Sequence, residues 1–316
     1  MSSKPRVAIA IGDPAGIGPE IALRAAYSRQ VNEICEPVIV GDLEVLARYA
    51  HTLRKQLPPN VVDLGAINVN FLTPGESDAA CGRAILEYAG KAVEMAEAGE
   101  ADAVVACPQT QSSIKAAGIE FDGYPSWVAR RTGTDPEDVF MMLVSDRLRI
   151  AHTTLHVGVR EALGQIDTHR IVRVIKATRT ALQCIGIGTP KIAVSGINPH
   201  AGEGGLFGTD DEKIVAPAIA EAQESGVDVY GPFGADTMYL DESYDAYVVM
   251  FHDQGHIPAK LLGFNGTAAF AIGTPVLFSS VAHGSALDIA GRGKADPGAL
   301  IWAIKQVLGA AVSAED

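Results

Sequence analysis

Short apolar runs alternate along the chain with longer stretches in which apolar residues recur every three or four positions. The runs predict strands at 7–11, 38–40, 103–106, 149–153, 192–195 and 247–250. The longer stretches predict helices, one beginning near Pro19 and others over 81–98, 168–183, 211–224 and 298–308. Strands separated by helices of this length pair in parallel through crossover connections. The pattern therefore predicts an α/β protein, with any lobe boundary at a crossover between strands.

Composition agrees with an ordinary globular protein. The chain has 316 residues, of which 47% are hydrophobic and 20% charged, enough for one large domain or two lobes around a cleft. No apolar run approaches the ~20 residues that a membrane helix needs, and no basic start precedes an apolar stretch. We therefore expect a cytoplasmic protein without a membrane partner.

Cysteine usage argues against a disulfide-bonded protein, and net charge argues against a nucleic-acid-binding protein. Cys35, Cys81, Cys107 and Cys184 are scattered without pair spacing and are expected to be free thiols in a reducing compartment. A formal net charge of −13 repels nucleic acid, and no basic stripe compensates.

A glycine-rich segment, GDPAGIGPE at 12–20, follows the first predicted strand and leads into a helix. Its glycines permit close backbone approach, and the helix N-terminus favours an anion. The spacing is not that of the dinucleotide fingerprint, so a tight strand-to-helix turn is an equally good interpretation.

Three histidines follow predicted strands. His156, His200 and His252 each lie among glycine, proline or polar residues, at the strand ends where open α/β sheets place ligands. Converging imidazoles would make a metal site with open positions for substrate. The wide spacing matches no local metal motif, so isolated, satisfied polar histidines are the alternative.

A second glycine-rich loop, 283–297, precedes the last predicted helix and carries Asp288, which we expect to be buried. An acid in a cofactor pocket suits a ribose diol and repels a 2′-phosphate. A surface loop with a helix cap is the alternative interpretation.

Four segments taken together, 12–20, 198–203, 231–237 and 252–255, resemble the 4-hydroxythreonine-4-phosphate dehydrogenase family over about 7–308. The resemblance implies a two-lobed, isopropylmalate-dehydrogenase-like α/β fold with parallel or mixed sheets and an interlobe active-site cleft. It also implies a cofactor-side lobe at 1–125 plus 280–316 and a metal-binding, dimerising lobe at 126–279. The family is further expected to form a homodimer with shared active sites.

The resemblance also implies the site residues. One divalent metal, zinc or alternatively another first-row ion or magnesium, is expected on His156, His200 and His252. Catalytic roles are expected for Lys260, Asp236 and Asp253. NAD is expected on Gly284, Ser285, Ala286, Asp288 and Ile289.

Departures from the family pattern bear on the substrate. Where phosphate-handling members carry His and Thr contacts, this chain has Tyr124 and Pro125; Ala269 and Phe278 replace a family Asn and Arg, Gln111 replaces a Lys, and Lys260 is retained. Losing an arginine removes the group best suited to bidentate anion capture. We therefore expect Tyr124, Pro125, Phe278 and Lys260 to line a pocket for a flat carboxylated ring.

Segments 121–126, 279–285 and 288–293 resemble the terephthalate dihydrodiol dehydrogenase branch more closely. That resemblance implies NAD-dependent oxidation of 1,2-dihydroxy-3,5-cyclohexadiene-1,4-dicarboxylate to protocatechuate with loss of CO₂, as in aromatic catabolism. A 4-hydroxythreonine- or threonate/erythronate-phosphate dehydrogenase remains an alternative, as does a metal-dependent hydrolase or lyase. The metal, exact substrate and general base are left open.

Overall fold

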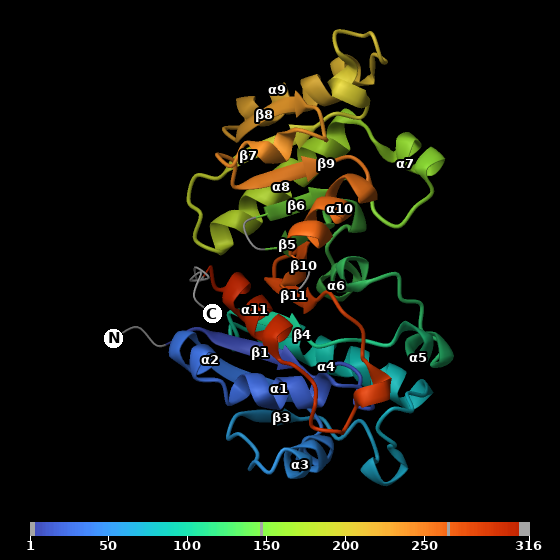
Figure 1. The fold of residues 1–316 in the computed structure, drawn as a ribbon, viewed down its shortest axis with the longest axis vertical. Coiled ribbons are helices and arrows are strands. Elements are labelled where there is room, and N and C mark those ends of the chain that lie inside the picture. The colour runs from blue at the N-terminus through green and yellow to red at the C-terminus, as the bar shows by residue number, and fades with distance from the viewer. Residues whose placement is uncertain (1–3, 146–147, 264–265, 310–316) are drawn as a thin grey trace. The chain divides into compact units, whose positions relative to one another are not determined.

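The computed structural model describes residues 4–145, 148–263 and 266–309. The chain divides into two compact units, Met1–Thr132 with Pro275–Asp316, and Gly133–Thr274. Each unit is an α/β layer structure in which a sheet is covered by helices (Figure 1). The predicted α/β class is therefore confirmed.

The first unit contains five parallel strands in the order β3-β2-β1-β4-β11. Their bounds are β1 Arg6–Ala10, β2 Glu36–Gly41, β3 Val61–Asp63, β4 Ala103–Ala106 and β11 Phe278–Val281. The central strands β1 and β4 are almost entirely buried, as expected for a parallel sheet covered on both faces.

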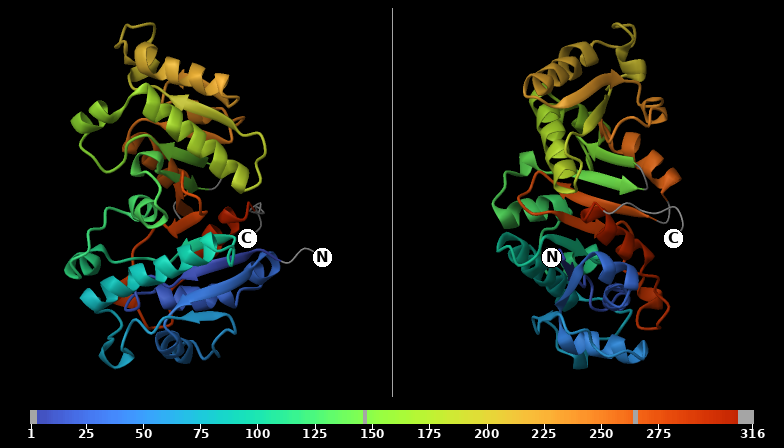
Figure 2. Two further views of the ribbon diagram at one scale, coloured as in Figure 1. Left: turned by 180° about the vertical axis from the view of Figure 1, so that it is seen from behind. Right: turned by 90° about the vertical axis from the view of Figure 1, so that its left-hand side faces the viewer.

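Helices cover both faces of this sheet (Figure 2). Helices α1 and α11 contact each other on one side, while α4 packs against β1, β2 and β4 from the other. The helices of this unit are α1 Gly18–Ala26, α2 Arg29–Ile34, α3 Leu43–Thr52, α4 Ala79–Glu97, α5 Gln111–Ala116, α6 Tyr124–Thr132 and α11 Gly298–Val307, with 3-10 turns at Val69–Phe71 and Leu287–Ile289.

The second unit contains a mixed sheet in the order β10-β5-β6-β9-β7-β8. The pairs β10–β5 and β5–β6 are antiparallel, whereas β6–β9, β9–β7 and β7–β8 are parallel. The bounds are β5 Phe140–Ser145, β6 Leu148–His152, β7 Lys191–Ser195, β8 Asp228–Phe233, β9 Ala246–Val249 and β10 Thr267–Ile272.

Helices α8 and α9 cover one face of this sheet and α10 covers the other (Figure 2). The helices are α7 Val159–Gln165, α8 Thr168–Cys184, α9 Ala216–Glu224 and α10 His252–Leu262. Tight turns lie at Pro136–Asp138, Pro199–Gly202 and Met238–Leu240, and a π turn at Asp211–Val215 precedes α9.

The sequence pattern located the strongly periodic elements and missed others. All six predicted strands and all five predicted helices are present within a few residues, except that 211–224 begins as a π turn before α9. The antiparallel strand β5, a continuous apolar run, was not predicted, nor was α10, which begins at His252 in a segment rich in polar residues. None of the helices formed by the described residues is both long and apolar enough to cross a membrane.

Candidate functional site

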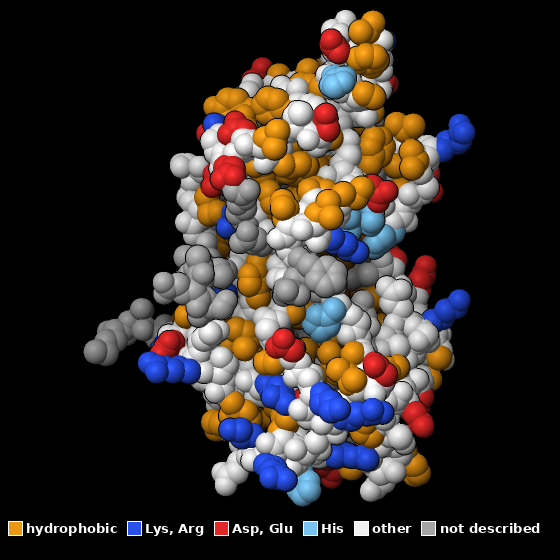
Figure 3. Space-filling view, in the orientation of Figure 1, with side chains coloured by type: hydrophobic (Ala, Val, Ile, Leu, Met, Phe, Trp, Pro, Cys, Tyr) orange, Lys and Arg blue, Asp and Glu red, His pale blue; other side chains and the backbone are white. Residues whose placement is uncertain are grey.

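Two of the three predicted metal-binding histidines lie together in the second unit. The imidazole rings of His156 and His252 have centroids 5.6 Å apart. Both line a pocket of about 320 Å³, whose other residues are Thr154, Leu155, Val157, Val159, Ala162, Phe251 and Asp253. On the face drawn in Figure 3, histidine side chains lie beside a basic side chain in the region of α10.

The pairing of β6 with β9 brings these histidines to one place. The parallel ladder continues beyond both strands, because Thr153 N donates to Val249 O at 2.8 Å and Thr154 N donates to Met250 O at 3.2 Å. The carboxyl ends of parallel neighbours lie at the same edge of a sheet. The residues that follow, including His156 and His252, therefore emerge side by side.

The position of His252 is fixed at the start of α10. Its Nδ1 lies 2.7 Å from Asp253 Oδ1, which leaves Nε2 for another partner. The next residue, Gln254, accepts two backbone N–H bonds at 2.9 Å each through Oε1 and donates to Gly196 O at 3.1 Å. Gln254 thereby ties the first turn of α10 to the end of β7, a role that the sequence analysis did not assign.

His200 lies in a strained turn after β7. The buried carboxylate of Asp211 holds this turn, accepting from Ile197 N at 2.7 Å and from the backbone and side-chain amides of Asn198 at 3.1 and 2.9 Å. His200 and Ala201 both have a φ of +52°, a left-handed conformation that costs about 1–3 kcal/mol per residue. Such strain is characteristic of ligand-binding segments.

The three predicted metal ligands are not grouped as a triad. Over 4–145, 148–263 and 266–309, no three His, Cys, Asp or Glu side chains form a metal-binding group. The ring of His200 contacts Phe207, with centroids 5.8 Å apart. A Cβ at Gly234 would lie 3.7 Å from His200 Cα and 2.8 Å from Asp236 Oδ1, so His200 lies beside the turn that bears Asp236. Convergence of the imidazoles within one chain is thus observed for His156 and His252 only.

Two histidines that the sequence analysis overlooked extend this pair. The ring of His256 stacks on that of His252 with a centroid distance of 3.6 Å and an interplanar angle of 11°. His152, only 2% exposed, lies next to His256 at 4.8 Å. Burial lowers the pKa of His152 to about 3 and that of His256 to about 4, so both rings are neutral near pH 7. The four-residue spacing of His252, His256 and Lys260 along one helix face was the available signal.

The expected cofactor loop lies in the first unit between β11 and α11. Ser285 is buried, and Ala286 adopts a left-handed backbone with a φ of +40°. Asp288 is exposed, which corrects the expectation of a buried acid. Its carboxylate is accordingly free of the cost of burial and accessible to a ligand.

The segment 12–20 packs directly against this loop. Ile17 N donates to Ser285 O at 2.9 Å. The Thr110 hydroxyl donates to the buried Asp13 carboxylate and lies 2.8 Å from Ser285 Oγ. A Cβ at Gly16 would lie 2.8 Å from Ser285 Cβ, so only glycine permits this approach. The glycine-rich motif therefore shapes the cofactor loop in addition to turning the chain.

Glu20 holds the far end of the same loop. Its side chain is 1% exposed, and its oxygens accept from Gly293 N at 3.1 Å and Ala295 N at 2.8 Å. Arg24 pairs with Glu20 at 3.4 Å and donates to Gly293 O at 2.7 Å. The first helix thus determines the path of a segment about 270 residues away.

Two of the four expected substrate positions, Tyr124 and Phe278, are more buried than a ligand-stacking surface would be. Phe278 is fully buried, and its ring centroid lies 4.9 Å from that of Tyr124. Tyr124 is 5% exposed, burial raises its pKa, and its hydroxyl has no hydrogen-bond partner among the described residues. In this structure Phe278 supports Tyr124, and a direct substrate contact of Phe278 stays a prediction. Pro125 follows Tyr124 in the first turn of α6, and Lys260 is exposed on α10.

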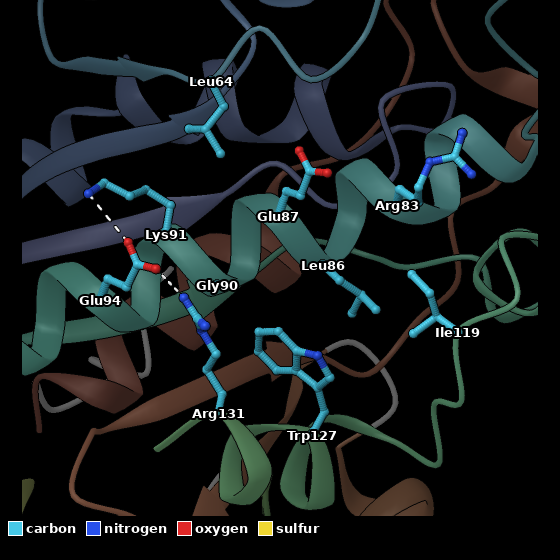
Figure 4. Close-up of a pocket in the computed structure, with 10 residues that line it drawn as sticks. All are labelled: Leu64, Arg83, Leu86, Glu87, Gly90, Lys91, Glu94, Ile119, Trp127 and Arg131. Carbon is cyan, nitrogen blue, oxygen red and sulfur yellow. Dashed lines mark hydrogen bonds and ion pairs between the residues drawn. The ribbon is translucent and has the colours of Figure 1, made fainter. Parts of the chain in front are cut away.

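A second pocket, of about 580 Å³, lies along α4 in the first unit (Figure 4). Its apolar part includes Trp127 and Leu86, and Glu94 pairs with both Lys91 and Arg131 at its rim. None of the predicted site residues lines it. The pocket lined by His156 and His252, called the histidine pocket from here on, is therefore the better candidate for the catalytic site.

The donor chemistry of the histidine pocket fits a divalent metal, although one chain brings only two ligands together. Imidazole nitrogen suits zinc and other first-row ions. Partial burial lowers the pKa of His156, which favours the neutral form that binds metal. The carboxylate on His252 Nδ1 is the kind of partner that orients a ligating histidine.

The fold and site define an α/β protein with histidines at the strand ends of one unit and a glycine-rich loop in the other. Residues 33–307 match the family described as pyridoxal phosphate biosynthetic protein PdxA. The chain belongs to the PdxA family.

Relatives in this family carry out two kinds of dehydrogenation. A 1,2-dihydroxy-3,5-cyclohexadiene-1,4-dicarboxylate dehydrogenase from Comamonas sp is 44% identical, covering 96% of this chain and 97% of that protein. A 4-hydroxythreonine-4-phosphate dehydrogenase from Desulforapulum autotrophicum is 36% identical, covering 96% and 94%. The crystal structure of a terephthalate 1,2-cis-dihydrodiol dehydrogenase from Burkholderia xenovorans is 44% identical with a TM-score of 0.78, covering 98% and 100%. These similarities identify the chain as a dehydrogenase of the PdxA family.

Proposed function

We propose that this chain is an NAD-dependent dehydrogenase that oxidises a carboxylated cis-dihydrodiol and releases CO₂. The observation that carries the proposal is the buried contact between Tyr124 and Phe278, at positions where phosphate-handling members of the family are expected to carry polar ligands. A phosphate leaving water needs charge-assisted donors, and a buried phenylalanine ring supplies none. The similarity to the Comamonas enzyme supports the same substrate class.

The proposed reaction has two steps, a hydride transfer and a decarboxylation. The carbinol carbon of the substrate loses a hydride to NAD and its hydroxyl loses a proton, which gives a ketone beside the carbon that bears a carboxylate. The bond to that carboxylate then breaks, CO₂ leaves, and the electron pair of the bond gives the ring enolate, whose oxygen takes up a proton to complete the catechol. Recovery of aromaticity favours the second step.

The histidine pocket would support this chemistry. His156, His252 and His200 would hold one divalent metal, with Asp236 and Asp253 as supporting carboxylates. When bound, the ion would supply a Lewis acid at the vicinal oxygens of the diol. Lys260, two turns after His252 on α10, would hold a substrate carboxylate or carry a proton.

The loop between β11 and α11 would bind the cofactor. Asp288 is exposed there, so its carboxylate can accept hydrogen bonds from an adenosine ribose and repel a 2′-phosphate. The remaining contacts would come from Gly284, Ser285, Ala286 and Ile289. The hydrogen bonds that Ile17 and Thr110 make to Ser285 support this role, because they preform the loop.

We further propose a homodimer whose active sites are shared. Within one chain His156 lies near His252, whereas His200 lies beside Asp236. A separation of this kind is expected of a metal site that a second copy of the chain completes. Sedimentation of the active enzyme as a dimer is expected. A fully active monomer would contradict the proposal.

The decisive assay compares the dicarboxylated dihydrodiol with 4-hydroxythreonine-4-phosphate and threonate 4-phosphate. NADH formation and release of protocatechuate with CO₂ are expected for the diol, with a kcat/KM above that for either phosphate. A tenfold preference for a phosphate would overturn the substrate assignment. Turnover of substrate without NADH formation would instead favour a hydrolase or lyase.

A further inference from the structure

Besides the His156 ring, a second imidazole contacts His252 and lies flat against its ring. The rings of His252 and His256 are stacked with centroids 3.6 Å apart and planes within 11° of parallel. His256 Nδ1 also lies 3.1 Å from His252 O, so it is joined to the same residue through the backbone. The His252 ring is thus held between His256 on its face and Asp253 at its Nδ1 edge.

The stacked geometry excludes His256 as a second ligand to the ion that His252 would bind. An imidazole nitrogen donates its lone pair within the plane of its ring. Because the two planes are nearly parallel and lie one above the other, the in-plane lone pairs of His252 and His256 do not converge on one point. His256 therefore acts on His252 as a support.

The buried ring of His152 fixes the proton of His256. His152 Nδ1 lies 3.3 Å from Met141 O, an acceptor, so Nδ1 carries the hydrogen and Nε2 presents a lone pair. That Nε2 is 3.1 Å from His256 Nδ1, which also faces the carbonyl of His252. His256 Nδ1 is therefore the donor to two acceptors, and the ring cannot flip without losing both bonds.

The helix is shaped to admit this contact. A Cβ at Gly255 would lie 2.4 Å from His152 Nε2, so the ring of His152 occupies the space that any other residue would fill. His152 is 2% exposed and lies at the end of β6, whose neighbour β9 leads into His252. The row from His152 through His256 to His252 thus links the sheet to the edge of the pocket.

We propose that His256, locked in its Nδ1–H tautomer by His152, is a positioning residue that holds the His252 imidazole in a metal-binding orientation. This inference rests on the proposed metal site at His252. Partners of this kind typically change metal affinity by about 10–100-fold when they are removed.

The test measures Co²⁺ or Zn²⁺ binding to the full-length protein by calorimetry and by the visible spectrum of the Co²⁺ form. His256→Ala is expected to weaken binding by about 10–100-fold with the number of ions bound unchanged. His152→Leu is expected to weaken binding less, and the double variant no more than His256→Ala, because the two act in series. His152→Gln, which keeps an acceptor, is expected to restore most of the affinity. His169→Ala, at an exposed histidine of α8, is the matched control.

Each outcome decides between the alternatives. Unchanged affinity in His256→Ala overturns the positioning role while leaving the proposed metal site intact. A lost spectral band that shows one ligand fewer would make His256 a ligand. Absence of metal binding by the wild type overturns both the proposed function and this inference. Independently of metal, a ¹⁵N spectrum of the histidine side chains should show the Nδ1–H tautomer of His256, and the opposite tautomer would contradict the lock.

Discussion

The ring of Tyr124 packs on that of Phe278 with centroids 4.9 Å apart, and the tyrosine hydroxyl at the end of this contact has no hydrogen-bond partner among the described residues. A buried hydroxyl without a partner costs about 1–3 kcal/mol. The Tyr124 hydroxyl is in this state and lies at an expected substrate position, so it is well suited to form a hydrogen bond with a bound substrate.

Tyr124→Phe is therefore expected to leave stability unchanged or raised while lowering kcat/KM for the dihydrodiol about tenfold, the value of one hydrogen bond of about 1.4 kcal/mol. Urea unfolding and steady-state kinetics measure the two effects. Phe278→Ala is the matched comparison and should lose about 3–5 kcal/mol of stability because its ring is fully buried. Reduced stability with normal activity in Tyr124→Phe would show that the hydroxyl has a structural role instead.

Glu20→Gln should loosen the cofactor loop. The variant replaces a buried carboxylate that accepts from Gly293 N and Ala295 N, and bonds to a charged group are worth about 1.5–3 kcal/mol. We expect a several-fold higher KM for NAD and faster hydrogen exchange over 284–295. Glu33→Gln, at an exposed helix pair with Arg29, should change neither. Equal behaviour of the two variants would show that Glu20 does not position the loop.

Asp288 should determine cofactor preference. Its exposed carboxylate would accept from the adenosine 2′-hydroxyl and repel a 2′-phosphate, a like-charge contact that costs several kcal/mol. The ratio of kcat/KM for NAD to that for NADP is therefore expected to be high in the wild type and to fall in Asp288→Lys. A wild-type enzyme that uses both cofactors equally would contradict this assignment.

Removal of any one of His156, His200 or His252 should abolish tight metal binding and activity together. The reason is that a site with three imidazole ligands keeps too few contacts when one is replaced by alanine. Metal content after dialysis and NADH formation are the two measurements. Full activity of the wild type after chelation and dialysis would disprove the metal requirement.

The buried His152 should make stability depend on pH in the acidic range. Its pKa is lowered to about 3 by burial and by His256, whereas the unfolded chain takes up the proton near 6.5. Between these values the unfolded state binds more protons, so stability is lost as the pH falls. From pH 6.5 to 5 the loss should be on the order of 1–2 kcal/mol, measured by urea unfolding in the presence of a chelator. His152→Gln should remove this part of the slope, and an unchanged slope would rule out His152 as its source.

Local pattern was sufficient for much of the fold. The alternation of apolar runs and helical periodicity located β1, β4, β7 and β9 and helices α4 and α8, because each buries a continuous face whose spacing is fixed by the element itself. The placement of His156, His200 and His252 after strands predicted that the three would converge, since parallel neighbours end at one edge, and the structure brings His156 and His252 together but not His200.

Tertiary structure decided what these residues touch. From the sequence alone, Phe278 was expected to line the substrate pocket in place of a family arginine, and Asp288 was expected to be a buried acid. Folding instead buries the Phe278 side chain completely and leaves the Asp288 side chain exposed. It also joins Glu20 to Gly293 across 273 positions and His152 to His256 across 104. No local periodicity encodes such partners, because they are set by which strands become neighbours and by the space that residues such as Gly255 leave between a helix and its sheet.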